Sequence, residues 1–215
     1  MSSPDDGKKR LAPTLRILAA TSLLFALGCQ LTGKGVLRPV ETRDEGGFTI
    51  TESARLGVGD RGRFEEAIEA IEANDLEAGI AILESLAEAS PQVATVHIDL
   101  GIARQRNEDF EAAEQALRQA IALHASHPIA WNELGIVLRR MGRFEEAKEA
   151  YSKALSRHPD FHHARKNLAI LCDLYLGDLD CALDHYERYV EAMPEDENVA
   201  IWIADLQNRR NAGAN

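Results

Sequence analysis

The sequence predicts an all-α fold, a solenoid of about four helix-turn-helix repeats followed by a C-terminal capping helix. Three observations lead to this prediction. Only 6% of the 215 residues are aromatic, while Ala, Leu and Glu are abundant, and this composition favours helices. A helical hairpin is recognisable between residues 128 and 159, and its pattern returns at intervals of 34 residues along most of the chain.

The clearest repeat begins with a helix on which Trp131, Leu134 and Leu138 lie at i, i+3 and i+7, and therefore on one face. The period breaks at Gly142, and Pro159 ends a second helix because proline cannot continue one. The apolar stripe of that second helix consists of Phe144, Ala147, Ala150, Tyr151, Ala154 and Leu155. A hairpin this short leaves its outer faces exposed, so we expect neighbouring repeats to cover them.

Small residues stand inside both helices of this hairpin, at Gly135 and Ala147, and indicate a close approach of the two backbones. The residues of the pattern, in order, are Trp131, Leu134-Gly135, Ala147 and Pro159. This spacing resembles the tetratricopeptide repeat (TPR), although Tyr151 stands where that signature has Phe and Leu138 where it has Tyr. The resemblance implies a right-handed superhelix whose concave groove is lined by the first helix of each repeat.

The pattern recurs in steps of 34 residues, except that the last repeat has one extra residue near the turn at Gly177-Asp178. We therefore predict four repeats, at 60–93, 94–127, 128–161 and 162–196. A further amphipathic segment lies within 197–215 and has Ala204 at the small position. It is expected to be a capping helix, which covers the last apolar face and presents a polar one, and a short tail.

The first residues, 1–28, are predicted to be a signal peptide. Basic residues between Lys8 and Arg16 precede the apolar run Ile17–Leu27, which is too short to span a membrane.

The sequence Ala26-Leu27-Gly28-Cys29 resembles the lipobox of bacterial lipoproteins, although leucine more often stands where this chain has Ala26. The resemblance implies cleavage before Cys29 and acylation of Cys29 with several chains, which together anchor a protein stably. Because Gln30 is not Asp, it also implies the outer membrane of a Gram-negative envelope. The alternatives are a plain cleaved signal peptide with a chance cysteine and an uncleaved membrane anchor.

Residues 29–59 are predicted to be a flexible tether, because they are rich in Gly, Thr and charged residues and show no sustained helical period. Within them, Phe48-Thr49-Ile50-Thr51 alternates like a short strand, while Thr51 is equally able to cap a helix.

The resemblance to TPR proteins also implies which residues face the groove, chiefly the fifth and ninth of each first helix. The predicted groove residues are Phe64, Ile68, Ile98, Ile102, Gln105, Arg106, Asn132, Ile136, Arg139, Lys166, Asn167 and Ile170. The isoleucines would form an apolar stripe for an extended or helical peptide. The alternative is that some of these isoleucines pack between adjacent helices.

The basic members of this set gather in the C-terminal half of the groove, as Arg139 and Lys166 illustrate, and favour an acidic segment or a C-terminal carboxylate. The carboxylate clamp of chaperone-binding TPR domains is not reproduced, because Phe64 and Ile68 occupy its first two positions. Alternatively, the arginines are solvated residues at helix ends, where they suit the helix dipole.

Cys172 and Cys181 flank the predicted turn of the last repeat, where an antiparallel hairpin brings such positions close. In an exported protein this spacing predicts a disulfide, and the alternative is a pair of buried thiols. His158, His162 and His163 cluster without the acidic or cysteine partners that a metal site needs, so we predict surface histidines and no metal.

The sequence shows no nucleophile elbow, phosphate loop or dinucleotide fingerprint, so we expect neither an enzyme nor a cofactor. A net charge of −11 argues against nucleic acid. The leading hypothesis is a lipid-anchored periplasmic adaptor that holds a partner protein or peptide at the outer membrane. Resemblance to envelope TPR lipoproteins, which include pilotin-like factors, suggests pilus biogenesis. The segment 164–175 resembles TPR proteins that accompany TonB/ExbB-type energy-transduction systems. The alternative is a self-associating structural module.

Overall fold

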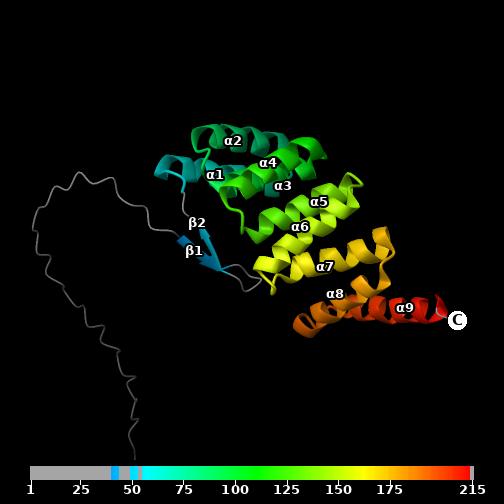
Figure 1. Ribbon diagram of the computed structural model, residues 1–215. Coiled ribbons are helices and arrows are strands. Elements are labelled where there is room, and N and C mark those ends of the chain that lie inside the picture. The colour runs from blue at the N-terminus through cyan, green and yellow to red at the C-terminus, as the bar shows by residue number, and fades with distance from the viewer. Residues whose placement is uncertain (1–39, 44–48, 53–54, 214–215) are drawn as a thin grey trace, which may run out of the picture. The chain divides into compact units, whose positions relative to one another are not determined.

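The computed structural model describes residues 40–43, 49–52 and 55–213 of the chain. Within these residues the protein is helical apart from one pair of short strands, as Figure 1 shows, and the predicted all-α class is confirmed. The predictions for the signal peptide and for lipidation of Cys29 lie outside the described residues. No helix in the described part of the chain is both long and apolar enough to cross a membrane.

The helices follow one another as four pairs and a final single helix (Figure 1). The pairs are α1 (Val58–Glu72) with α2 (Leu76–Ala89), α3 (Ala94–Arg106) with α4 (Phe110–Leu123), α5 (Pro128–Arg140) with α6 (Phe144–Arg157), and α7 (His162–Leu171), continued by the π-helical turn η1 (Cys172–Leu176), with α8 (Leu179–Ala192). The final helix is α9 (Glu197–Gly213). The two helices of each pair pack together, and each second helix packs against the first helix that follows it.

Small residues allow the two helices of a pair to touch. A Cβ added to Gly135 in α5 would lie 2.5 Å from the ring of Tyr151 in α6, and one added to Gly101 in α3 would lie 2.6 Å from Leu117 in α4. Gly79 closes the first pair in the same way, with the glycine on the second helix. The large partner side chains are buried, so in each of the first three pairs one bulky residue packs against a residue without a side chain.

The turn between the helices of the fourth pair is one residue longer than the others. In the second pair, the N–H of Asp109 donates to the carbonyl of Arg104 five residues earlier, and the first and third pairs make the equivalent bond. In the fourth pair, the N–H of Asp178 donates to the carbonyl of Cys172, six residues earlier, at 2.9 Å. The π-helical turn η1 accommodates the extra residue. Gly177, with φ 64°, then closes the turn in the left-handed region.

A disulfide joins Cys172 and Cys181, the two cysteines that the sequence analysis singled out, across this longer turn. The second helix of the pair starts at the same place, because the carboxylate of Asp178 accepts a hydrogen bond from the N–H of Cys181 at 3.1 Å. The disulfide therefore ties the end of the first helix to the beginning of the second.

Helix α9 caps the array only in part. Val199 and Leu206 are fully buried, as expected of a helix that covers the last pair. Ile201 and Trp202 on the same helix are exposed, so the polar outer face expected of a cap is not what α9 presents throughout. Ala204 is also exposed, because α9 has no second helix of its own among the described residues to approach that small position.

The segment expected to be an irregular tether contains two short strands. Strand β1 (Val40–Arg43) pairs antiparallel with β2 (Thr49–Glu52), with Val40 opposite Glu52. Of the two alternatives for Thr51, the structure therefore has the strand. The sequence analysis recognised the alternation in β2 but assigned no partner to it.

Substitution of Gly135 by alanine tests the close approach of paired helices. The new methyl group would clash with the buried Tyr151 ring, so we expect Gly135→Ala to lower the free energy of unfolding by about 1–3 kcal/mol in urea titrations. The matched control is Gly62→Ala in α1, where a Cβ meets no atom within 4 Å and helix propensity gains about 0.5–1 kcal/mol. Equal stabilisation by both substitutions would contradict the packing described here.

The pH dependence of stability tests the environment of His127, which precedes α5. His127 is buried, and its Nδ1 atom has no hydrogen-bond partner among the described residues. Burial, with smaller contributions from the nearby His124 and His158, lowers the pKa of His127 from 6.5 to about 4. Between these two values the unfolded chain binds a proton at this residue that the folded chain does not, so stability is lost as the pH falls.

We therefore expect the wild-type protein to lose about 3 kcal/mol more unfolding free energy than His127→Gln between pH 7 and pH 4. Denaturant titrations of both proteins across this range provide the measurement. Parallel pH profiles would show that His127 is not held neutral by the fold.

Reduction tests the disulfide. In Cys29→Ser protein, Cys172 and Cys181 are the remaining two of three cysteines, so alkylation followed by intact-mass measurement reports on them alone. We expect no alkylation before reduction and two adducts after it. Reduction should cost about 2–3 kcal/mol of stability, because the disulfide closes a short loop in the unfolded chain. Two alkylated thiols in the native, unreduced protein would disprove the bond.

Candidate functional site

The predicted groove residues divide into two groups by burial. Phe64, Ile68, Ile102, Ile136 and Ile170 are each partly exposed on the first helices of the pairs. Ile98 and Asn132, by contrast, are both only 4% exposed. Ile98 packs in a cluster with Ala120 and Ala130, so it is one of the isoleucines that lie between helices.

Asn132 and Asn167 link two repeats instead of facing a partner. The side-chain amide of Asn167 donates to Oδ1 of Asn132 at 3.0 Å, and the amide of Asn132 donates to Glu133 at 2.9 Å. Burial raises the pKa of Glu133, a shift that the hydrogen bond from Asn132 opposes. The side-chain amides of Asn132 and Asn167 therefore form hydrogen bonds within the protein.

The basic residues of the C-terminal half of the groove are also engaged internally. Lys166 pairs with Asp196 at 2.6 Å, and its ammonium group lies 5.6 Å from the centre of the Trp202 ring. Arg139 donates to the hydroxyl of Tyr175 at 3.3 Å, and its guanidinium group lies over the Tyr175 ring. In the region where a positive patch was expected, Asp196 therefore neutralises the charge of Lys166. The guanidinium group of Arg139 is covered by the ring of Tyr175.

The remaining predicted polar residues lie on the second pair. Gln105 is partly exposed, and Arg106 is exposed at the end of α3. Arg106 makes no ion pair within the described part of the chain.

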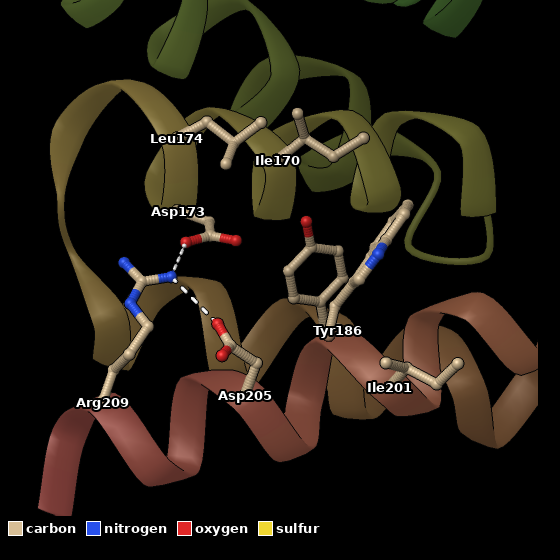
Figure 2. Close-up of a pocket in the computed structure, with 8 residues that line it drawn as sticks. Ile170, Asp173, Leu174, Tyr186, Ile201, Asp205 and Arg209 are labelled. Carbon is tan, nitrogen blue, oxygen red and sulfur yellow. Dashed lines mark hydrogen bonds and ion pairs between the residues drawn. The ribbon is translucent and has the colours of Figure 1, made fainter.

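An open, largely apolar pocket of about 530 Å³ lies between the end of the fourth pair and α9 (Figure 2). We call it the C-terminal pocket. Its lining residues are Ile170, Asp173, Leu174, Tyr186, Ile201, Trp202, Asp205 and Arg209. Among the predicted groove residues, only Ile170 belongs to this set.

The C-terminal pocket coincides with the main apolar surface of the described chain. Five large hydrophobic side chains are exposed in the described part of the chain. Four of them lie in η1 and α9, namely Leu174, Tyr175, Ile201 and Trp202. The π-helical turn and the disulfide shape this wall, because Leu174 and Tyr175 belong to the wide turn that begins at Cys172. A concentration of exposed apolar side chains beside a concave surface is typical of a binding site.

One cation and two carboxylates form the polar side of the pocket. Arg209 lies between the other two, 2.7 Å from Asp173 and 3.6 Å from Asp205, as Figure 2 shows. The side chain of Asp173 is largely buried, whereas that of Asp205 is 66% exposed. The three groups sum to one negative charge.

One cluster of metal-ligating residue types lies at the turn of the fourth pair. In the described part of the protein, one group of metal-ligating side chains converges, formed by Cys172, Asp178 and Cys181. Both of its sulfur atoms are bonded to each other, so neither is available as a thiolate ligand.

Most of the C-terminal pocket was not predicted from the sequence, because the last helix was expected to be a closing cap. Counting the repeat forward by 35 residues from Lys166 and Ile170 reaches Ile201 and Asp205. The same positions that face the groove in α7 therefore face it in α9. That extension of the repeat was the available signal.

Trp131, the first residue of the recognised repeat pattern, does not lie fully within the core. The structure leaves Trp131 partly exposed, packed at the edge of two core clusters, with its indole N–H donating to the carbonyl of Ala125 at 2.9 Å. Truncation of a partly exposed side chain lowers the free energy of unfolding less than truncation of a fully buried one.

Comparison with known proteins agrees with this architecture. Residues 128–161 match the family model of the tetratricopeptide repeat. No match was found among curated protein sequences.

Three solved structures illustrate the similarity of the fold. PilF of Pseudomonas aeruginosa is 20% identical, with a TM-score of 0.64 over 71% of this chain and 69% of that one. MamA of Desulfovibrio magneticus RS-1 is 16% identical, with a TM-score of 0.65 over 73% and 88%. The complex of Naa15/Naa10 bound to HypK contains a chain that is 19% identical, with a TM-score of 0.58 over 72% and 23%.

The structural matches extend the similarity well beyond residues 128–161, to about seven tenths of the chain. The second pair, which precedes that repeat, shares its close glycine contact and its five-residue turn. Residues 128–161 are therefore a tetratricopeptide repeat, and the protein has the TPR solenoid fold.

Proposed function

We propose that this protein is a lipid-anchored adaptor that holds a partner protein in its groove at the periplasmic face of the outer membrane. The observation that carries the binding part of the proposal is the C-terminal pocket, with exposed apolar side chains on both of its walls. The membrane part rests on the lipobox-like sequence that ends at Cys29.

The C-terminal pocket suits a segment of protein. Its exposed apolar residues come from two helices that are fixed by the core beneath them, since Cys172 and Leu206 are buried in one continuous cluster. A preformed apolar surface loses little conformational entropy on binding, which favours affinity. Helical or extended peptides commonly dock through a few apolar side chains in such grooves.

The chemistry of the pocket favours binding over catalysis. Its ionic groups pair with one another through Arg209, and its other polar side-chain groups are the hydroxyl of Tyr186 and the indole N–H of Trp202. A tyrosine with a raised pKa is a poor nucleophile, and burial raises the pKa of Tyr186. A scaffold that captures a partner needs no more than this surface.

The envelope pathway is the most specific part of the proposal. The lipoprotein resemblance suggests pilus biogenesis, and the resemblance of residues 164–175 suggests TonB/ExbB-type energy transduction. PilF of Pseudomonas aeruginosa shares the fold at 20% identity, and the similar Naa15/Naa10 structure contains a bound protein partner, HypK. Both comparisons support a scaffold, at the level of fold and general role.

Site-specific crosslinking in the source cells tests the proposed function. A photoreactive amino acid replaces Leu174, which is 68% exposed at the pocket, or Glu149, an exposed residue of α6 outside it. We expect a discrete crosslinked partner from position 174 and not from position 149. Introducing Cys29→Ser should deplete that product from membranes, because the chain would lose its acylation site.

Three results would count against the proposal. Identical crosslinks from positions 174 and 149 would show that the pocket does not select a partner. Crosslinks solely between copies of this chain would instead favour the self-associating module, if the apparent molar mass from light scattering also falls on dilution. Retention of Cys29→Ser protein on the membrane would contradict the lipid anchor.

A further inference from the structure

We infer that the C-terminal pocket recognises a segment of the partner in which a bulky aliphatic side chain stands next to a lysine or arginine. This inference rests on the proposed function and specifies the chemistry of the partner. It also replaces the acidic ligand that the sequence alone favoured. Three features of the pocket support it, namely its apolar walls, its net charge and the hydroxyl group of Tyr186.

The apolar walls define the first half of the recognised pair. Leu174 on one side and Ile201 on the other are each about two-thirds exposed, and Trp202 is 37% exposed beside them. Burying an aliphatic side chain among these groups removes apolar surface of both partners from water. The pocket volume of about 530 Å³ leaves room for a leucine-sized or larger side chain and adjacent backbone.

The charges define the second half of the pair. Arg209 is shared by two carboxylates, and its contact with Asp173 is shorter than its contact with Asp205. Asp205 is therefore the less satisfied and more exposed of the two acids, and an incoming ammonium or guanidinium group can pair with it. An incoming carboxylate would meet repulsion at the same point.

The neighbouring cations do not reverse this balance. Lys166 is neutralised by Asp196 at 2.6 Å, and Arg210 lies 3.6 Å from Asp180. The whole chain carries a net charge of −11, which attracts basic partners over a longer range at low ionic strength. Local and global electrostatics thus favour the same sign of ligand.

The hydroxyl of Tyr186 provides an independent sign that the pocket is built to hold a ligand. Tyr186 is 1% exposed, and its hydroxyl group points from α8 toward the α7 side of the pocket, as Figure 2 shows. It makes no hydrogen bond to any residue that the structure describes. Burial and the nearby charge of Asp173 raise its pKa, so it keeps its proton and can donate to a peptide carbonyl.

Binding of short alanine-based peptides to the Cys29→Ser chain, purified without its lipid, tests the inference. Four fluorescently labelled peptides carry Leu-Lys, Leu-Gln, Leu-Glu or Ser-Lys at their centre, and fluorescence polarisation reports binding. We expect the Leu-Lys peptide to bind about fivefold more tightly than Leu-Glu, as one exposed ion pair against one repulsive contact allows. The Ser-Lys peptide should bind about tenfold more weakly than Leu-Lys, because it buries less apolar surface.

Matched variants locate the binding. Ile201→Ser should weaken the Leu-Lys peptide about tenfold, while Val58→Ser, which removes a comparable exposed side chain from α1, should leave it unchanged. Asp205→Lys should reverse the preference, so that Leu-Glu binds more tightly than Leu-Lys. Glu149→Lys makes the same change of charge in α6 and should preserve the wild-type order.

Equal affinity of wild-type protein for the Leu-Lys and Leu-Glu peptides would overturn the inference, as would binding that Ile201→Ser leaves intact. Absence of binding by every peptide below about 1 mM would overturn it as well. If the protein proves dimeric and Ile201→Ser makes it monomeric, the pocket holds a second copy of the chain and the inference is wrong. The proposed function is judged separately, by crosslinks of the intact protein in cells.

Discussion

The close approach of paired helices is the constraint on which the rest of the structure depends. Gly135 and Gly101 leave no room for a side chain, and the bulky Tyr151 and Leu117 of the partner helices fill the space. The first three pairs are thereby fixed in register. In the fourth pair the small residues Ala169 and Ala182 are fully buried. The first helix of each pair then turns a defined set of residues toward the groove.

The fourth pair departs from its neighbours by one residue, and the candidate site lies where it departs. Because the turn after α7 spans six residues instead of five, η1 widens and leaves Leu174 and Tyr175 exposed. The disulfide between Cys172 and Cys181 holds this wider turn against α8. The extra residue of this turn helps to form one wall of the C-terminal pocket, and α9 forms the other wall.

The repeat period was visible in the sequence because each pair needs its small residue and its apolar stripe at a fixed spacing. The ion-pair and hydrogen-bond partners of individual polar groups were not visible in the sequence. Lys166 looked like a free cation, yet Asp196, thirty residues later, neutralises it across the fold. Asn132 was assigned to the groove by its position, but pairing with Asn167 buries it between repeats. Such partnerships depend on the tertiary structure, which local spacing does not encode.

The central claim is that the C-terminal pocket, and not the earlier part of the groove, holds the partner. Hydrogen–deuterium exchange with and without the Leu-Lys peptide tests it most directly, because backbone protection maps binding along the whole chain. The account predicts slower exchange confined to the segment from Ile170 to Leu174 and to α9. Protection of α1 and α3 with no change in α9 would contradict it.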